Sequence, residues 1–287
     1  MLETNFNGLR VLALENRRAK EVAMLIRSAG GVPTVVPVMR EIPLDSNEAA
    51  FSFAQALLAG QFDVVLFLTG VGARILFAAV ESRFSREDFL QALKQTRVAV
   101  RGPKPVAVLR ELGVTADIVS QEPSTWRELL VALDTAYPTG MSGLRIAIQE
   151  YGAVNSQLLE GLAQRGAQVT RVPVYQWALP EDLDEMRATI RALERGEFDV
   201  LLFLTGVQAL HLLQVADEMG QRQALLESLK RIVIVSVGPS TNEELARQGI
   251  SPDFQPSHPR MGILVNEAAK VAQSLLERKR SSSNTKD

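Results

Sequence analysis

Cysteine is absent from this sequence of 287 residues, and histidine occurs only twice, as His211 and His258. The absence of cysteine excludes disulfide bonds, thiolate metal sites and a cysteine nucleophile, and it is typical of a reducing compartment. Two histidines are too few for most histidine-based zinc sites, and they disfavour a Ser-His-Asp triad. We therefore expect no metal site, and we expect His211, which lies in a helical segment, to be structural.

Long apolar runs and a strong net charge are missing as well. No apolar stretch approaches the roughly 18 residues of a membrane-spanning helix, and the N-terminus lacks the basic and apolar segments of a signal peptide. The formal net charge is −2, so no basic field suggests nucleic acid. We expect a cytoplasmic protein that binds neither nucleic acid nor membrane, and the length predicts about two domains.

One stretch of the chain is present twice. Phe62–Val71 recurs as Phe198–Val207, with nine of ten residues identical at an offset of 136. Each copy predicts a buried parallel strand that ends at Thr-Gly and opens a helix. Backbone N–H groups at such a helix start can bind an anion. A plain strand-to-helix connection would explain one copy alone, but the duplication favours a ligand-binding role.

Strand and helix signals alternate through both halves of the chain. The triplet Gly-Leu-Arg at residue 8 recurs at residue 143, and Gly102-Pro103 recurs as Gly238-Pro239. This alternation predicts an α/β protein with two flavodoxin-like parallel-sheet domains. In that class, the carboxyl ends of the strands form the ligand surface. The polar, serine-rich tail from Arg278 onward is expected to be disordered.

Hydroxyls, glycines and scattered basic residues follow the predicted strand ends, and they suit a ligand with many carboxylates better than one strong catalytic group. The P-loop and dinucleotide-binding fingerprints are both absent. Arg17 and Arg18 are more typical of a solvated helix start, and Ser240 and Thr241 would equally suit a helix cap. The candidate substrate-binding residues are Arg17, Arg18, Thr69, Gly70, Gly72, Arg74, Arg101, Lys104, Tyr151, Gly152, Thr205, Gly206, Ser240 and Thr241.

Taken in order, these motifs resemble the uroporphyrinogen-III synthase family. The resemblance covers residues 8–275 and rests on the duplicated stretch, on Val172–Gln176 and on Gly238–Thr241 with the following helix. It implies a monomeric, cyclising lyase that converts hydroxymethylbilane, a linear tetrapyrrole with many carboxylates, into uroporphyrinogen III without cofactor or metal. It also implies that Tyr175 assists departure of the substrate hydroxyl, although a packed aromatic residue would explain Tyr175 equally well.

The resemblance further implies a discontinuous domain map. Simple repetition would divide the chain near Tyr137. The family pattern instead gives a first domain of residues 1–38 plus 179–287 and a second domain of residues 39–178. A two-stranded linker, formed by residues 38–43 and 174–180, would connect the two domains and act as a hinge around a large ligand.

Three positions depart from the family pattern. Gly70 and Gly206 occupy the place where many members carry serine, and Pro105 replaces the counterpart of Thr241. The alternative function is a non-catalytic, two-lobed binding protein for an anionic small molecule. The presence of Tyr175 favours the enzyme, whereas a two-lobed glycosyltransferase would need a diphosphate-binding turn that is not evident.

Overall fold

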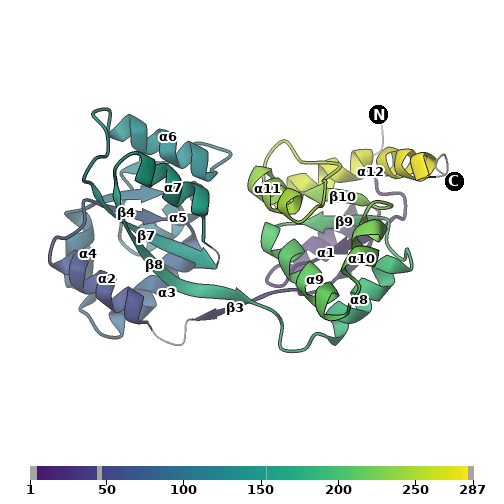
Figure 1. The fold of residues 1–287 in the computed structure, drawn as a ribbon, viewed down its shortest axis with the longest axis horizontal. Coiled ribbons are helices and arrows are strands. Elements are labelled where there is room, and N and C mark those ends of the chain that lie inside the picture. Colours follow the sequence, from purple (N-terminus) through teal and green to yellow (C-terminus); the bar gives the residue numbers. More distant parts are fainter. Residues whose placement is uncertain (1–4, 44–46, 153, 284–287) are drawn as a thin grey trace. The chain divides into compact units, whose positions relative to one another are not determined.

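The computed structural model describes residues 5–43, 47–152 and 154–283, and it divides into two compact units (Figure 1). Unit 1 contains residues 1–40 and 178–287, and unit 2 contains residues 41–177. The chain therefore crosses between the units twice, at 40/41 and 177/178, whereas the family resemblance implied boundaries at 38/39 and 178/179. Each unit is an α/β domain with a parallel sheet, which confirms the predicted fold class.

Unit 1 is built on a four-stranded parallel sheet with the order β10-β9-β1-β2. Taken in chain order, this is the flavodoxin-like arrangement 2-1-3-4. The strands are β1 (Arg10–Ala13), β2 (Val32–Val35), β9 (Val200–Phe203) and β10 (Val233–Ser236). Every residue of β9 and β10 is buried, as expected for a parallel sheet covered on both faces.

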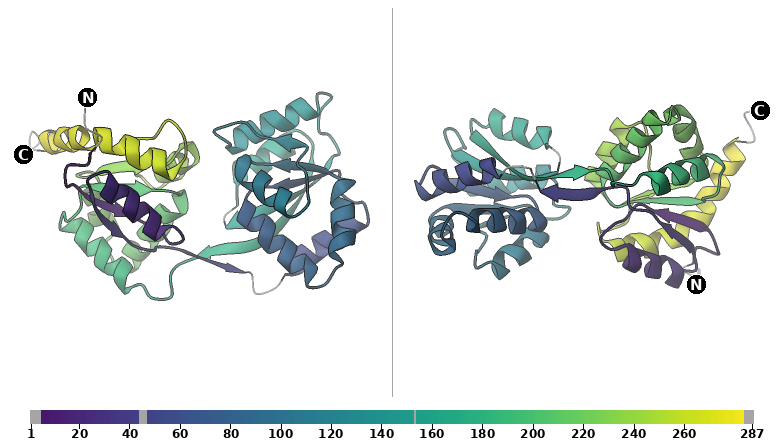
Figure 2. Two further views of the ribbon diagram at one scale, coloured as in Figure 1. Left: turned by 180° about the vertical axis from the view of Figure 1, so that it is seen from behind. Right: turned by 90° about the horizontal axis from the view of Figure 1, so that it is seen from below.

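Helices cover both faces of this sheet, and each face has its own apolar core (Figure 2). Val11 and Ala13 face one core and Leu12 and Leu14 face the other, because successive side chains of a strand alternate. The first face is covered by α1 (Ala19–Ser28) and α12 (Met261–Ser283). The second is covered by α8 (Asp184–Glu194), α9 (Gly206–Glu218), α10 (Arg222–Leu229) and α11 (Pro239–Arg247).

Unit 2 contains a six-stranded sheet with the order β3-β8-β7-β4-β5-β6. Its strands are β3 (Arg40–Pro43), β4 (Val64–Phe67), β5 (Arg97–Val100), β6 (Ile118–Val119), β7 (Arg145–Gly152) and β8 (Gln168–Ala178). The four strands β8-β7-β4-β5 repeat the spatial order β2-β1-β9-β10 of unit 1, with β6 added at the edge, although the chain forms β4, β5 and β6 before β7 and β8. This permutation is why the domain map is discontinuous. Both crossings lie at β3 and β8, which are neighbours in this sheet.

Six helices cover the sheet of unit 2 among the described residues. One face carries α2 (Glu48–Leu58), α3 (Gly70–Glu81), α4 (Arg86–Lys94) and α5 (Pro103–Glu111). The other face carries α6 (Trp126–Ala136) and α7 (Ser156–Gln164). The sequence repeat with its offset of 136 thus corresponds to two sheets whose central strands have the same order. Strands β4 and β9, which lie within the two copies of the duplicated stretch, hold equivalent central positions.

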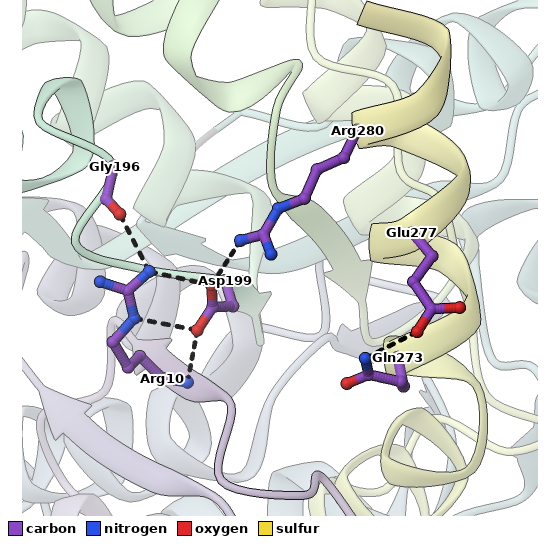
Figure 3. A network of polar contacts seen from close by, with 6 residues as sticks. All are labelled: Arg10, Gly196, Asp199, Gln273, Glu277 and Arg280. Carbon is purple, nitrogen blue, oxygen red and sulfur yellow. Dashed lines mark hydrogen bonds and ion pairs between the residues drawn. The ribbon is translucent and has the colours of Figure 1, made fainter. Parts of the chain in front are cut away.

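A repeated aspartate connects the amino ends of the central strands in each unit. Asp199 accepts hydrogen bonds of 2.9 Å from the backbone N–H, Nε and Nη2 of Arg10 (Figure 3). Asp63 accepts the same three hydrogen bonds from Arg145, at distances between 2.8 and 3.1 Å. In unit 1, Arg280 of α12 adds a further hydrogen bond of 2.9 Å to Asp199.

The predicted disorder of the tail from Arg278 is wrong for residues 278–283, which form the last turns of α12. Two basic side chains of these turns bind groups at the amino edge of the sheet. Lys279 donates to the Ile232 carbonyl oxygen at 2.7 Å and pairs with Asp253 at 2.6 Å. Arg280 pairs with Asp199, so the polar composition serves docking of the helix rather than disorder. The remainder of the predicted tail, residues 284–287, lies outside the described residues.

We expect Lys279→Met to lower the free energy of unfolding of unit 1 by about 2 kcal/mol, because a charged hydrogen bond to partly buried partners is lost. The change keeps a long, helix-forming side chain, so it tests the contacts rather than the helix propensity. Chemical denaturation followed by far-UV circular dichroism would measure it. Lys270→Met is the control, since Lys270 is exposed on the same helix. Equal stabilities of the two variants would contradict the prediction.

Candidate functional site

Each unit has a turn where its central strand ends and a helix begins. We call these the strand-end turns: residues 68–72 between β4 and α3, and residues 204–208 between β9 and α9. They lie beside the point where the strand order reverses, between β7 and β4 in unit 2 and between β1 and β9 in unit 1. In open α/β sheets this switch point is the usual ligand-binding position.

In unit 2, Thr69 is the N-cap of α3. Its backbone is extended, with φ −144° and ψ 148°, and its Oγ1 accepts a hydrogen bond of 3.0 Å from the Gly72 N–H. Because Oγ1 already accepts this bond, the hydroxyl hydrogen is left to be donated elsewhere. Thr69 is only partly buried, so a ligand carboxylate is a suitable acceptor.

In unit 1, Thr205 holds the equivalent N-cap position of α9. Its backbone is again extended, with φ −158° and ψ 150°, and its side chain is partly buried. Both helices begin at the glycine that directly follows the threonine, Gly70 in α3 and Gly206 in α9. The two turns therefore present a threonine hydroxyl at the positive end of a helix dipole in each unit.

The glycines after these threonines are required by packing between helices. A Cβ atom on Gly70 would lie 2.7 Å from Cγ2 of Val108 in α5, and one on Gly206 would lie 2.4 Å from Cβ of Glu244 in α11. Such distances are far shorter than van der Waals contact. The helices cross so closely that serine does not fit in this structure, which explains the departure from the family pattern at both positions.

The next strand of each sheet ends in the repeated Gly-Pro. Gly102 has φ 82°, and a Cβ atom there would lie 2.5 Å from Oγ of Ser124, so glycine is needed on both grounds. Beside it, Arg101 is partly buried and Lys104 is exposed. In unit 1, Ser240 is exposed, whereas Thr241 is 5% exposed and lies in the first turn of α11.

Two of the predicted basic contacts form ion pairs on exposed surfaces. Arg18 forms an ion pair with Glu21 in the first turn of α1, and Arg74 of α3 forms one with Glu111 of α5. Exposed pairs of this kind are weak, so a ligand with several carboxylates could compete for either arginine. Arg17 is exposed as well.

The last predicted contacts lie in β7 and β8. Gly152 belongs to β7 rather than following it, and a Cβ atom on it would lie 1.8 Å from Cδ1 of Trp177. The side chain of Tyr151 lies outside the described part of the structure. Tyr175 is 3% exposed and packs edge-to-face against Trp177, with 5.6 Å between the ring centroids.

Two functional candidates were missed by sequence reasoning. Gln149 and Gln208 are 1% and 0% exposed, and both bind the backbone of a strand-end turn. The signal available in the sequence was an amide in an otherwise apolar run, Ile146–Gln149, and a glutamine at the start of α9. Neither signal distinguishes a buried amide from a solvated one, because the burial depends on which element packs against it.

His211 of α9 was predicted to be structural rather than a metal ligand or a catalytic base. Its Nδ1 donates to the Val38 carbonyl oxygen at 2.9 Å, and burial lowers the pKa of the imidazole while this hydrogen bond opposes the shift. Among residues 5–43, 47–152 and 154–283, no group of three or more metal-ligating side chains is placed to hold a metal ion. No helix within those ranges has the length and apolar character needed to cross a membrane.

Comparison with known proteins then identifies the family. A family model described as uroporphyrinogen-III synthase HemD matches residues 20–266, which include parts of both units. The chain belongs to the uroporphyrinogen-III synthase family. A putative uroporphyrinogen-III synthase of Methanothermobacter thermautotrophicus is 31% identical over 238 residues, covering 82% of this chain and 87% of the relative. An uncharacterised Bacillus subtilis protein, YjjA, is 29% identical over 264 residues, or 92% of this chain and 96% of that protein.

Solved structures of the same family share the fold. A mutant uroporphyrinogen III synthase from Thermus thermophilus is 27% identical, with a TM-score of 0.71, and the match covers 93% of this chain and 100% of that chain. The synthetase from Helicobacter pylori is 13% identical with a TM-score of 0.52, covering 92% of this chain and 99% of that one, so it supports the fold alone.

Proposed function

We propose that this chain is an active uroporphyrinogen-III synthase, a cyclising lyase acting on hydroxymethylbilane. The observation that carries the proposal is the family match over residues 20–266, which contains both strand-end turns. The proposed substrate is a flexible, linear tetrapyrrole with many acetate and propionate groups. The proposed products are uroporphyrinogen III and water.

The proposed reaction needs an ordered sequence of bond changes. The terminal hydroxyl leaves with a proton as water, which leaves an azafulvene-like cation at the end of the chain. Ring D attacks this carbon through its substituted position and forms a spiro intermediate, which fragments and closes again with ring D inverted. Overall one C–O bond and one C–C bond break and two C–C bonds form, and the ring D carbon that closes the ring releases a proton that balances the one taken up by the departing hydroxyl. Holding the chain so that inversion outruns direct closure is mainly a task of positioning.

The strand-end turns have groups suited to that task. The hydroxyls of Thr69 and Thr205 would donate to substrate carboxylates, together with backbone N–H groups at the helix starts. Ser240 and Thr241 would contribute in the same way at the start of α11, with Arg101 and Lys104 supplying charge in unit 2. These assignments are supported by the placement of each residue at the carboxyl end of a strand.

One assay tests the proposal. Hydroxymethylbilane is generated with its upstream synthase in the presence of this chain, and the products are oxidised and separated into type I and type III isomers. We expect the type III isomer to predominate, whereas the type I isomer forms without the protein. Accumulation of type I alone would reject the enzymatic function.

Burial of Tyr175 favours a second candidate function, a two-lobed binding protein without turnover. A side chain that is 3% exposed is poorly placed to assist a leaving hydroxyl unless the protein moves. This candidate predicts that the chain binds hydroxymethylbilane or the porphyrin product while forming no type III isomer. Fluorescence titration with uroporphyrin III, run beside the isomer assay, separates the two functions.

If Tyr175 assists departure of the hydroxyl, Tyr175→Phe should reduce the turnover rate for the type III isomer about 100-fold, a typical contribution of acid catalysis. The ring and its packing against Trp177 are kept, so the melting temperature should change little. Tyr137→Phe is the control, because Tyr137 caps α6 away from the strand-end turns. Unchanged turnover would remove Tyr175 from the mechanism.

We also propose that residues 38–43 and 174–180 act as a hinge. We further propose that the protein is a cytoplasmic monomer and that its reaction needs no cofactor. The hinge is supported by the two crossings at residues 40 and 177, since no other peptide connection joins the units. Small-angle scattering with and without uroporphyrin III would show compaction if the hinge closes. Sedimentation equilibrium would test the monomer.

A further inference from the structure

A buried amide supports the strand-end turn of unit 2. Gln149 lies on β7 beside Phe67 of β4, and its side chain reaches the turn. Its Oε1 accepts a hydrogen bond of 3.3 Å from the Thr69 N–H, and its Nε2 donates to the Glu150 carbonyl oxygen. The amide therefore satisfies a backbone donor at the N-cap that would otherwise be buried without a partner.

A second buried amide supports the strand-end turn of unit 1, but it comes from the helix. Gln208 lies in the first turn of α9, and its Oε1 accepts from the Leu204 N–H at 2.7 Å and from the Thr205 N–H at 3.3 Å. Its Nε2 donates to the carbonyl oxygen of Leu14, the residue that follows β1. In both units a glutamine Oε1 thus accepts from the threonine N–H and its Nε2 donates to a backbone carbonyl oxygen, and unit 1 adds the hydrogen bond from Leu204.

The two supporting amides come from different positions of the sequence repeat: Gln149 from the strand and Gln208 from the helix. At the repeat offset of 136, Gln208 corresponds to Gly72, and at the offset of 135, Gln149 corresponds to Leu14. The pairing of the strands supports the equivalence of Gln149 and Leu14. The residues just before them, Ile148 and Ala13, pair with Leu66 and Leu202, which are themselves equivalent in the repeat. One unit therefore combines a strand glutamine with a helix glycine, and the other combines a strand leucine with a helix glutamine.

Packing shows why one unit cannot hold a glutamine on both the strand and the helix. A Cβ atom on Gly72 would lie 2.0 Å from Nε2 and 2.5 Å from Cδ of Gln149. The place where a side chain of residue 72 would begin is thus already filled by the Gln149 amide. In unit 1 the equivalent place is the start of the Gln208 side chain, and the residue that corresponds to Gln149 is the buried, apolar Leu14.

We propose that Gln149 and Gln208 are positioning residues for Thr69 and Thr205, and that strand and helix can exchange the supporting amide. Each amide holds the threonine N–H inward and keeps the N-cap extended, so that the hydroxyl is presented to a substrate carboxylate. This role rests on the proposed function. It concerns residues that contact the threonine backbone and not the reacting atoms.

Gln149→Met removes both amide functions while keeping the length of the side chain. We expect KM for hydroxymethylbilane to rise about tenfold, with kcat changed less than about threefold, because ground-state and transition-state contacts weaken together. Hydrogen exchange of the Thr69 N–H should accelerate at least about tenfold, since its buried acceptor is lost. Unchanged KM and unchanged exchange would overturn the proposal, as would a loss of thermal stability alone.

The exchange of partners gives a matched rescue. Gly72→Gln alone should lose activity and stability, because its side chain collides with Gln149. The double variant Gly72→Gln/Gln149→Leu copies the arrangement of unit 1, and we expect KM to return to within about threefold of the wild-type value. If Gln149→Met fails to fold, the double variant decides, and an unfolded or unrescued double variant refutes the exchange.

Failure of the inference is distinguishable from failure of the proposed function. A wild-type chain that makes only the type I isomer rejects the function, and the exchange rates of Thr69 and Thr205 then still report whether the amides hold the turns. A wild-type chain that makes the type III isomer, with Gln149→Met kinetically and dynamically unchanged, rejects the positioning role alone.

Discussion

Asp199→Ala is expected to lower the free energy of unfolding of unit 1 by about 3 kcal/mol, because several hydrogen bonds between this buried carboxylate and two partly exposed arginines are lost together. Asp199 is 6% exposed and receives three hydrogen bonds from Arg10 and a fourth from Arg280. Without the carboxylate, the Arg10 N–H and two guanidinium groups lose their partner together. The strand pair β1–β9 and the end of α12 are weakened by one change.

The distribution of aromatic residues makes the measurement selective. Both tryptophans and all three tyrosines lie between residues 126 and 177, so tryptophan fluorescence reports on unit 2, whereas far-UV circular dichroism reports on both units. Asp63→Ala is the matched control, because Asp63 has the same three contacts to Arg145 but no second arginine among its described contacts, and its side chain is 35% exposed. We expect a smaller loss, visible in fluorescence. Equal losses in the two variants would contradict the role given to burial.

The effect of Asp199 should depend on pH. Burial raises the pKa of its carboxyl, but hydrogen bonds from the side chain and backbone of Arg10, aided by the charges of Arg10 and Arg280, lower it further than burial raises it. A carboxylate with a lowered folded pKa stabilises fully above the unfolded pKa, about 3.9, and loses this effect as pH falls through the folded pKa. The stability difference between wild type and Asp199→Ala should therefore stay constant from about pH 7 to 5 and shrink below about pH 4.

Gly206→Val is expected to destabilise unit 1 by about 3 kcal/mol through overpacking between α9 and α11. A Cβ atom at this position would lie 2.4 Å from Cβ and 2.7 Å from Cγ of Glu244. The first of these atoms is fixed to the backbone of α11, so rotation of the side chain cannot relieve the contact and the helices must separate. Thermal denaturation followed by far-UV circular dichroism would measure the loss.

Two controls separate this effect from glycine replacement in general. Gly262→Ala lies in α12 with no heavy atom within 4 Å of the added Cβ, and it should stabilise by up to about 1 kcal/mol through helix propensity. Gly70→Val meets Cγ2 of Val108 at 2.7 Å, a longer distance than the 2.4 Å to a Cβ atom at Gly206, so we expect a smaller loss than at Gly206. A stable Gly206→Val variant would show that the two helices are free to move apart.

Much of the fold was predictable because its signals are local. The predicted alternation of strands and helices in both halves agrees with the structure, since apolar periodicity, capping residues and β-prone runs act over a few residues. The duplicated stretch indicated the two central strands and the threonines that end them. Sequence spacing could not give the end of β7, which continues through Gly152 because it pairs with β8.

Composition was misleading where contacts are long-range. The polar residues from Arg278 onward resemble a disordered tail, but Lys279 and Arg280 bind Asp253 and Asp199, which are distant in the chain. Gly70 and Gly206 resemble ligand-binding glycines of a turn, yet each is required by a helix that crosses it. Such features depend on which elements meet, and a local pattern carries no information about that.

Repeated motifs, alternating elements and the absence of cysteine were sufficient to predict a duplicated α/β protein and, by resemblance, its family. They were sufficient because a buried strand, a helix start and an N-cap threonine are specified by neighbouring residues. The supporting amides are different, because Gln149 and Gln208 reach equivalent places from a strand in one unit and a helix in the other. Packing in three dimensions selects which residue fills that place, and so the two strand-end turns are supported alike although the supporting amide comes from different elements.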